Sequence, residues 1–350
     1  MSDMARDLAV ADYERFARVA LPQYQLDSAT VTLLSYSENG TFLIESEAAT
    51  GTEAGPQRQV LRVHRPGYHS LAAIESELDW MESLRADSAI TTPQVIPAPD
   101  GRRVVEARIG DEVYLVDMFT FVEGTIAEDD ASDISFSELG AITATLHEHV
   151  QRWQRPETFT RFRWDLDTML GAAGRWGNWR DAPALSAEDA TIIEEAERKV
   201  IERLTEYGMG PERFGLVHAD LRMSNLMVHD GKITVIDFDD CGWSWYLADL
   251  GAVVSFVEDT PDAARIIDEW LAGYRSVRDL PAADLVEIPT FVMLRRLMLT
   301  AWIGSHPESG PAQTLGHRYA AGTAQLAQAY LTDPSWFRVD VPAAAPTLTH

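Results

Sequence analysis

One segment near the middle of the chain, residues 216–240, limits more than any other what this sequence can fold into. It reads LVHADLRMSNLMVHDGKITVIDFDD. Apolar runs at 214–217, 226–228 and 233–236 predict three short strands, the last two forming a β-hairpin. The polar stretches between and after them are therefore expected to be two loops, of which the second carries paired carboxylates.

The polar residues of these loops follow a kinase-type pattern. His218, Asp220, Leu221 and Asn225 match H-x-D-L-x-x-x-N, and Asp237 follows Asn225 by twelve residues. Phosphoryl transfer from ATP needs one carboxylate to orient the attacking hydroxyl and accept its proton. It also needs an Asn and a second carboxylate to hold Mg²⁺ on the phosphates. The pattern predicts Asp220 as the catalytic base, Asn225 and Asp237 as metal ligands, and ATP and Mg²⁺ as cofactors. A His-x-Asp or an acidic turn by itself is common in structural loops, so the prediction depends on their combination in this order.

Two stretches carry a resemblance to a known family. HADLRMSN followed by VIDFDD resembles the motifs of the aminoglycoside phosphotransferase-like family, whose usual form is close to H-G-D-L-H-x-x-N and then I-D-F/W-x. VLRVHRPGYHS, residues 60–70, is similar to a small-lobe strand and turn of its branch of bacterial stress-response kinases and type II homoserine kinases. The resemblance covers most of the chain. It implies an α+β, two-lobed protein-kinase-like fold, with a small antiparallel-sheet lobe and a larger, mainly helical lobe. Family members phosphorylate aminoglycosides, choline, homoserine and related amino alcohols, and some phosphorylate proteins.

The resemblance also implies which small-lobe residues bind the nucleotide. Arg62 stands where this fold presents a basic residue to the α- and β-phosphates. Arg65 is its rival, because alternate residues of a strand face opposite sides. Glu77 fits the acid that pairs with this base in kinases, with Glu75 and Glu82 as rivals. The remaining expected contacts are Asn39 and Gly40, in the turn over the phosphates, and the hinge residues Met118, Phe119 and Thr120 beside the adenine.

Around the catalytic loop, the resemblance assigns supporting roles. Arg222 lies two residues after Asp220, where protein kinases carry a phosphate-contacting Lys and many relatives carry His, so we expect it to stabilise the transferring phosphoryl group. His218 is expected to brace the loop by hydrogen bonding. Asp249 fits the family acid that hydrogen-bonds the catalytic-loop backbone. The candidates for a second metal or for the acceptor are Asp239 and Asp240.

The segment 161–179 packs three tryptophans among charged residues and stands where relatives build an acceptor pocket. Trp164 and Asp165 are the candidate contacts, because an aromatic face and a carboxylate can both hold an ammonium group. A surface helix anchored by aromatics is the alternative. The chain has 55 acidic and 29 basic residues, a net charge of −26. This balance disfavours nucleic acid and anionic membranes as partners and favours a cationic small-molecule acceptor, unless it reflects a generally acidic proteome.

The organisation along the chain is expected to be simple. Residues 1–122 are assigned to the small lobe, 123–338 to the large lobe and 339–350 to a loose tail. The one cysteine, Cys241, excludes an intramolecular disulfide and is expected to be a small, semi-buried thiol. No apolar run approaches the roughly 20 residues of a membrane helix, and the start of the sequence lacks the pattern of a signal peptide. We therefore expect a cytoplasmic protein, while its oligomeric state stays open.

Periodicity predicts the secondary structure outside the motif segment. The expected strands are 31–36, 41–45, 60–64, 92–96 and 113–121. The expected helices are 10–24, 70–85, 136–153, 186–207, 245–256, 261–275, 283–304 and 314–331.

Three functions are compatible with these observations. The first is an ATP-dependent kinase acting on the hydroxyl of a small, amine-bearing molecule. The second is a protein serine/threonine kinase of the stress-response type, which the VLRVHRPG segment favours. The third is a catalytically silent nucleotide-binding scaffold, which the intact Asp220, Asn225 and Asp237 disfavour. The motifs specify the chemistry but leave open the acceptor and the choice between ATP and GTP.

Overall fold

The computed structural model describes residues 2–36, 39–47, 57–129, 134–172, 174–307 and 309–333, with side chains from residue 10 onwards. It forms two compact units, each built from several segments of the chain. Unit 1 comprises Met1–Asp129, Trp153–Phe162 and Leu226–Asp239; unit 2 comprises Asp130–Arg152, Arg163–Asn225 and Asp240–His350. The first break between these units comes after Asp129, and the lobe boundary was expected at residue 122. Two later segments of the chain also belong to unit 1. The tail expected at 339–350 lies outside the described residues.

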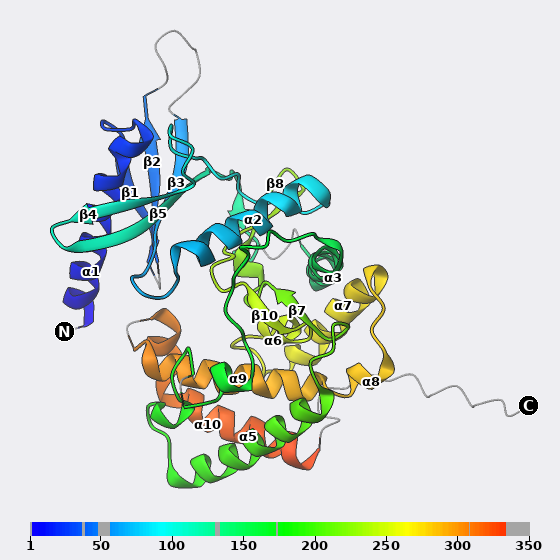
Figure 1. Cartoon of the computed structure of the whole chain (residues 1–350). Coiled ribbons are helices and arrows are strands. Elements are labelled where there is room, and N and C mark those ends of the chain that lie inside the picture. Colours follow the sequence, from blue (N-terminus) through cyan, green and yellow to red (C-terminus); the bar gives the residue numbers. More distant parts are fainter. Residues whose placement is uncertain are drawn as a thin grey trace, which may run out of the picture. The chain divides into compact units, whose positions relative to one another are not determined.

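Unit 1 contains a five-stranded antiparallel sheet in the order β1-β2-β3-β5-β4 (Figure 1). Its strands are β1 Thr30–Tyr36, β2 Gly40–Ser46, β3 Gln57–Val63, β4 Val104–Ile109 and β5 Glu112–Thr120. The strand predicted at 92–96 is wrong: this stretch makes isolated bridges through Thr91 and Val95, and β4 takes the place beside β5. Pro93 and Pro97 lack backbone N–H donors, which keeps the stretch from pairing as a regular strand.

The helix α1 Ser2–Ala20 and the 3₁₀ turn Leu21–Tyr24 pack on this sheet. Phe16 and Leu21 meet Phe42 and Leu61 in one apolar cluster. Gly40 has a packing reason to be glycine, because a Cβ there would stand 2.7 Å from the Tyr13 ring. Residues 37 and 38 of the same expected turn lie outside the described residues.

The helix α2 Leu71–Asp87 begins at Ser70, whose hydroxyl accepts a hydrogen bond from the Ala73 N–H. Ile74, Leu78, Met81 and Leu84 are buried as the spacing predicts, but Leu71 is 46% exposed, because it belongs to the first turn. A second, three-stranded sheet of unit 1 joins β6 Thr125–Ile126, β8 Leu226–His229 and β9 Lys232–Val235. The hairpin predicted from the apolar runs is therefore confirmed.

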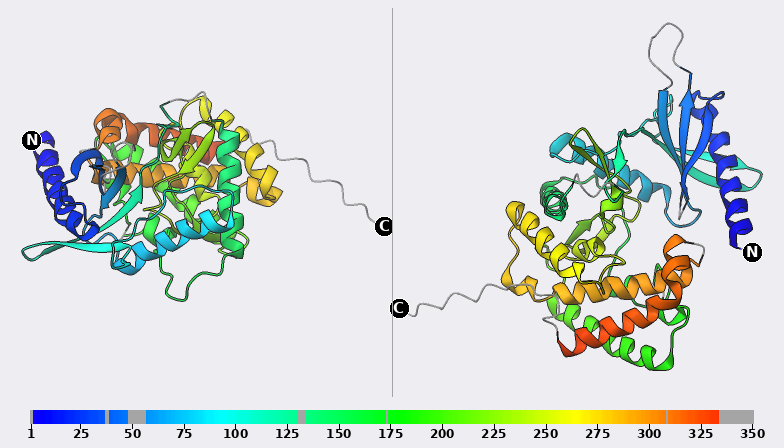
Figure 2. Two further views of the ribbon diagram at one scale, coloured as in Figure 1. Left: turned by 90° about the horizontal axis from the view of Figure 1, so that it is seen from above. Right: turned by 180° about the vertical axis from the view of Figure 1, so that it is seen from behind.

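Unit 2 is mainly helical. The helices α3 and α7 pack together, as do α5, α9 and α10, which lie side by side in Figures 1 and 2. The strands β7 Phe214–Val217 and β10 Gly242–Trp245 form a small antiparallel pair that carries the catalytic loop at one end. The helices are α3 Phe136–Arg152, α4 Leu166–Met169, α5 Ala187–Tyr207, α6 Ala248–Val253, α7 Asp262–Val277, α8 Ala282–Leu285, α9 Ile288–Ser305 and α10 Gly310–Thr332.

Three details of unit 2 differ from the prediction. The helix expected at 245–256 is limited to α6, because the residues before it pair with β7 as strand β10. In the described part of the segment 161–179, the helical structure is the four-residue α4 and the start of the 3₁₀ turn Trp179–Asp181. Glu197, expected to be solvated on α5, is buried because it accepts hydrogen bonds from Trp179 and Arg180. The N-cap of α5 is Ser186, whose hydroxyl accepts the Asp189 N–H.

No helix among the described residues is long and apolar enough to span a membrane.

Candidate active site

The catalytic loop of unit 2 brings Asp220 and Asn225 together. The loop leaves β7 and ends in a 3₁₀ turn, Met223–Asn225. Asn225 Nδ2 donates to the backbone carbonyl of Asp220 at 2.7 Å and to its Oδ2 at 3.1 Å. Because these bonds use the amide nitrogen, the atom that Asn225 can offer to a cation is its Oδ1. The spacing of the motif thus closes the loop by hydrogen bonds and leaves the amide oxygen of Asn225 as its candidate metal ligand.

Two arginines hold the Asp220 carboxylate. Arg222 Nε lies 3.2 Å from Oδ1 and 3.3 Å from Oδ2. Arg295, which comes from α9, donates from Nη2 to Oδ1. Burial raises the pKa of Asp220, but the charges of Arg222 and Arg295 outweigh it and hold that pKa below the ordinary value. The carboxylate is therefore ionised at neutral pH, as a proton acceptor must be. No motif linked Arg295 to the catalytic loop, since 75 residues separate it from Asp220.

Asp249 supports the loop from α6. Its Oδ1 accepts the Ala219 N–H at 2.7 Å and its Oδ2 accepts the His218 N–H at 3.4 Å. His147 Nε2 stands 3.0 Å from Oδ2. Burial lowers the pKa of His147 although Asp249 acts in the opposite direction, so this imidazole is neutral. The contact between Asp249 and the loop backbone is the one that the family resemblance implied, and His218 is fully buried beside it.

Asp237 lies in unit 1, on the loop after β9. Its φ of 62° is left-handed, a region that Asp adopts more readily than most residues. The neighbouring Phe238 is buried and packs edge-on against Trp80 with ring centroids 5.4 Å apart, which anchors the loop. An Asp carboxylate and the Asn225 amide oxygen are donors that suit Mg²⁺, which completes its shell with phosphate oxygens and waters. The residues present therefore fit the predicted metal.

Arg62 on β3 lies in a buried ionic cluster of unit 1. Its Nε and Nη2 donate to the two oxygens of Asp117 at 3.1 and 2.6 Å, and its Nη1 donates to Glu77 at 2.8 Å. The expected pairing of Arg62 with Glu77 is thus present, while Asp117 was not expected. Arg65 is exposed, with its guanidinium 5.8 Å from the Tyr68 ring centroid. The rivals of Glu77 are engaged elsewhere: Glu75 and Glu82 both pair with Arg103.

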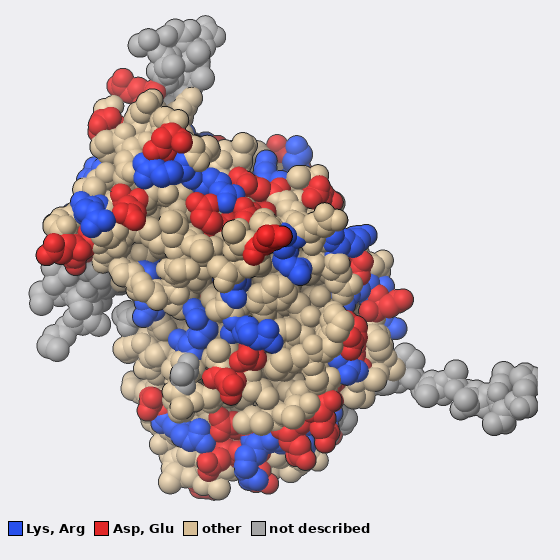
Figure 3. Space-filling model, viewed as in Figure 1, with Lys and Arg blue, Asp and Glu red and all other residues tan. Residues whose placement is uncertain are grey.

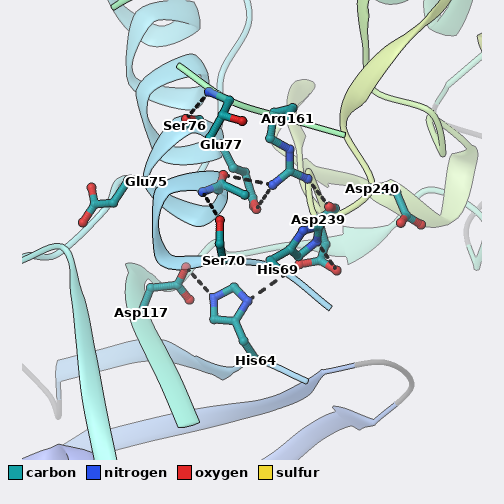
Figure 4. Close-up of polar contacts among 12 residues, drawn as sticks. His64, His69, Ser70, Glu75, Ser76, Glu77, Asp117, Arg161, Asp239 and Asp240 are labelled. Carbon is teal, nitrogen blue, oxygen red and sulfur yellow. Dashed lines mark hydrogen bonds and ion pairs between the residues drawn. The ribbon is translucent and has the colours of Figure 1, made fainter. Parts of the chain in front are cut away.

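Asp239 belongs to the same cluster. Its carboxylate lies 3.5 Å from His69, 3.7 Å from Arg62 and 3.8 Å from His64. Figure 4 shows His64 between Asp117 and Asp239. Burial acts to raise the pKa of Asp239, but His69 and Arg62 lower it far below its usual range. Arg161 joins the cluster with Nη1 3.7 Å from Glu77 and with Nη2 donating to the Asp239 carbonyl. The sequence does not indicate that these histidines and Arg161 belong here, because only the fold brings them together.

The turn and hinge residues are partly committed to the fold. Asn39 Oδ1 accepts the Arg65 N–H at 2.9 Å. The Met118 carbonyl accepts the Ile96 N–H at 2.7 Å, and the Thr120 N–H donates to Gln94 at 2.8 Å. Phe119 lies between them in β5, opposite Val60 of β3. The Met118 carbonyl and the Thr120 N–H thus each take part in one backbone hydrogen bond, and the contact of the hinge with adenine stays a prediction. Residues 121–124 directly follow β5 and connect it to β6.

On the acceptor side, a small pocket of unit 2 borders the catalytic loop. Trp164 is buried and donates from Nε1 to the Asp240 carbonyl at 2.7 Å. Asp165 caps α4, because its Oδ1 accepts the Thr168 N–H at 3.2 Å. The Asp165 carboxylate is thus engaged in the fold. The pocket is mostly apolar and is lined by Trp164, Met169, Trp176, Ala219, Ser244, Ala248, Phe291, Leu294, Arg295 and Met298.

The surface charge is mixed. On the face shown in Figure 3, acidic and basic side chains are interspersed and do not form one acidic field. The net charge of −26 therefore gives little support on this face to the idea that overall acidity attracts the acceptor.

The sheet of unit 1 and the catalytic loop of unit 2 define a kinase-like phosphotransferase. Residues 37–285 match the model of the phosphotransferase enzyme family, and the chain belongs to this family. A solved microcompartment-associated aminopropanol kinase is 46% identical, with a TM-score of 0.82, over 91% of this chain and 97% of that one. Amicoumacin kinase of Bacillus subtilis (strain 168) is 23% identical over 312 residues, 85% of this chain and 87% of that protein. The solved amicoumacin kinase hAmiN, in complex with AMP-PNP, Ca²⁺ and Ami, is 21% identical with a TM-score of 0.67, over 84% and 88% of the two chains. These findings confirm the predicted family, the kinase-like fold and the assignment as a kinase.

Proposed function

We propose that this chain transfers the γ-phosphoryl group of ATP to the hydroxyl of a small amino alcohol of the aminopropanol class. The observation that carries this proposal is the 46% identity with an aminopropanol kinase over 91% of the chain. The catalytic loop supports it, because the Asp220 carboxylate is ionised and fixed and Asn225 offers an oxygen ligand.

In this reaction the acceptor oxygen forms a bond to the γ-phosphorus, while the bond from that phosphorus to the β–γ bridging oxygen breaks and ADP leaves. Asp220 orients the acceptor hydroxyl and takes its proton. Arg222 is 26% exposed at its side chain, so it can turn from Asp220 towards the charge that develops on the phosphoryl oxygens. Mg²⁺, held by Asn225 Oδ1 and Asp237, would neutralise phosphate charge when bound. Positioning and charge neutralisation supply most of the rate in such chemistry.

The small-lobe residues would bind the nucleotide in two ways. Arg62 keeps a full positive charge in a fixed place, because Asp117 and Glu77 hold its guanidinium. We infer that it acts on the α- and β-phosphates from this place, as the family resemblance implies. The adenine edge would then be read by backbone groups of residues 121–124, which follow the last paired residue of β5.

The acceptor would use the pocket beside the catalytic loop. Its apolar lining suits the short hydrocarbon part of an amino alcohol. Of the three carboxylates expected near the acceptor, Asp165 caps a helix and Asp239 lies in the buried cluster of unit 1. Asp240 is half-buried in unit 2, where its backbone carbonyl binds Trp164. We propose Asp240 as the first candidate to test for the ammonium contact, because its backbone binds Trp164, which lines the pocket.

The test is an ATP-dependent transfer assay with a matched panel of acceptors. The panel contains 1-amino-2-propanol, ethanolamine, homoserine, an aminoglycoside, 2-propanol as the amine-free control and a generic protein substrate. We expect transfer to the amino alcohols and little to 2-propanol. Equal transfer to 2-propanol would contradict the ammonium contact, and labelling of the protein alone would mean that the chain is a protein kinase.

A variant pair tests the assignment of the ammonium contact. Asp240→Asn should raise the acceptor KM and leave the nucleotide KM unchanged. Asp165→Asn is the matched control: because Asn caps a helix about as well as Asp, it should leave both the melting temperature and the acceptor KM nearly unchanged. The opposite ranking of the two acceptor KM values would move the ammonium contact to Asp165.

A further inference from the structure

Arg295 is distant in sequence from every catalytic motif but contacts two residues of the catalytic loop. It lies on α9 and is 6% exposed. Its Nη2 donates to Asp220 Oδ1, and its Nη1 donates to the Ala219 carbonyl at 3.1 Å. Its Nε donates to Ser255 at 2.9 Å, and its guanidinium stacks 4.9 Å from the Trp176 ring centroid. A single buried side chain thus joins a helix of unit 2 to the residue that accepts the proton.

The backbone that Arg295 contacts is strained. Ala219 has a φ of 70°, a left-handed conformation that is unfavourable for an L-residue with a Cβ. Such a conformation persists only where the surroundings hold it. Asp249 accepts the N–H of Ala219, and Arg295 binds its carbonyl oxygen. The direction in which Asp220 leaves the loop therefore depends on both contacts.

The two arginines on Asp220 differ in how they are anchored. The side chain of Arg222 is 26% exposed and belongs to the loop itself, whereas that of Arg295 is 6% exposed and is fixed by Ser255 and Trp176. Arg222 can exchange Asp220 for a phosphoryl oxygen during the reaction. Arg295 cannot move without breaking its contacts on α9 and the loop.

We propose that Arg295 is a positioning residue that orients the catalytic carboxylate. It holds Oδ1 of Asp220 and the Ala219 carbonyl. As a result, Oδ2 faces the acceptor hydroxyl once Arg222 turns to the phosphoryl group. The inference rests on the proposed function in one respect, that Asp220 accepts the proton of the acceptor. It extends that function by placing a residue of α9 in the machinery of the catalytic loop.

Arg295→Met tests the proposal, because methionine fills a similar volume without the donors. We expect kcat to fall by about 100-fold, the scale of a misplaced reacting group. The dissociation constant of Mg-nucleotide, measured by calorimetry, should change by less than about twofold, since binding does not use Arg295. Arg295→Lys, which keeps the charge but not the fork, should recover part of the lost kcat.

The adjacent Arg296 gives a matched control on the same helix. It is as buried as Arg295 but pairs with Glu258 and hydrogen-bonds Thr323, and both partners lie apart from the loop. Arg296→Met should lower the melting temperature at least as much as Arg295→Met and leave the kcat of the folded protein within a few-fold. If both variants lose kcat equally and in proportion to their stability, Arg295 is only structural and the proposal is wrong.

A double-mutant cycle with Asp220→Asn distinguishes two roles of Arg295: orienting the Asp220 carboxylate and stabilising unit 2 as a whole. Because Arg295 acts through the carboxylate, adding Arg295→Met to Asp220→Asn should cost little further activity, read as slow transfer of labelled phosphate at high enzyme concentration. A second 100-fold loss in that background would overturn the proposal. If Arg295→Met fails to fold, the same double-mutant cycle is measured with Arg295→Lys. Failure of the proposed acceptor class would appear separately, as inactivity of the wild-type protein with amino alcohols.

Discussion

The two arginine–carboxylate centres described above are built in opposite ways. In unit 1 one cation, Arg62, is surrounded by anions, with Asp117 and Glu77 in direct contact. In unit 2 one anion, Asp220, is surrounded by cations, with Arg222 and Arg295 in direct contact. In each centre, the surrounding side chains of opposite charge keep the central group ionised. The first arrangement gives a permanent positive charge at a fixed place, and the second gives an ionised carboxylate with a fixed direction.

The centres also differ in their access to solvent. Asp117 and Glu77 are fully buried and Arg62 is 10% exposed at its side chain, so this centre changes partners only at a high cost in desolvation. Asp220 is 17% and Arg222 26% exposed, so the second centre can exchange partners during a reaction. We therefore propose that the centre of unit 1 supplies structure and a fixed charge and that the centre of unit 2 supplies proton transfer. The predictions below test this division.

The largest effect is expected at Asp220. Asp220→Asn removes the proton acceptor but keeps the shape of the side chain, so kcat should fall by about 10²–10⁴-fold or more. The melting temperature and the nucleotide affinity should stay close to those of the wild type. Turnover near the wild-type rate would show that Asp220 is not the base and that the centre of unit 2 is structural.

Asp117 should show the reverse balance. Asp117→Ala leaves Arg62 buried with one carboxylate fewer and removes the partner of His64, so we expect a loss of about 3–5 kcal/mol in the free energy of unfolding. Urea denaturation measures it. Asp100→Ala, at an exposed pair with Arg102, is the control and should change stability little. A small effect at Asp117 would mean that the cluster of unit 1 does not stabilise the fold.

Asp237→Ala should weaken the binding of Mg-nucleotide at least about tenfold more than the binding of metal-free nucleotide, because the lost carboxylate is a metal ligand. Calorimetry with Mg²⁺ and with a chelator measures both affinities. Equal losses under the two conditions would remove Asp237 from the metal site.

The two basic residues of the β3 region should differ in their effect on the nucleotide. Arg62→Lys replaces a fork held by two carboxylates with one ammonium group, so the nucleotide KM should rise several-fold. Arg65→Ala should leave that KM unchanged, because the Arg65 side chain is exposed beside Tyr68. If Arg65→Ala has the larger effect, the phosphates are bound from the other face of the strand.

The smallest effect concerns pH. Burial lowers the pKa of His147 in unit 2 and of His69 in unit 1 below the ordinary 6.5, so both imidazoles stay neutral in the folded protein. Unfolded chains take up these protons as the pH falls below about 6.5, so stability is lost on the acid side of that value. We expect the melting temperature to fall between about pH 7 and pH 5. The fall should be smaller in His147→Gln, and an unchanged pH dependence in that variant would show that His147 is not one of the groups responsible.

The sequence predicts the centre of unit 2 better than that of unit 1, for a physical reason. Asp220, Asn225 and the hairpin after them are local: hydrogen bonds within the loop and pairing of adjacent strands bring them together, so their spacing is visible in the chain. Arg295 is seen only as one of two charges interrupting an apolar helix, because its role depends on how α9 packs. Asp117 lies within a strand, and neither periodicity nor a motif indicates that it faces Arg62.

The same reasoning explains the errors in secondary structure. The segment 92–96 has strand-like residues, but its prolines remove the donors that a ladder needs, and β4 pairs with β5 instead. Local chemistry allowed two structures for this segment, and tertiary packing selected one. Asp165 shows how little charge alone specifies a role: an Asp just before a helical turn is also a favourable N-cap, a contact that it makes, and its part in acceptor binding stays a prediction.

The central claim is tested most directly by ³¹P NMR of the purified protein with ATP, Mg²⁺ and 1-amino-2-propanol. The account predicts a new phosphomonoester resonance that grows as ATP is converted to ADP, and that is absent with 2-propanol or with Asp220→Asn. Conversion of ATP to ADP with inorganic phosphate as the only new species, for every amino alcohol tried, would contradict it.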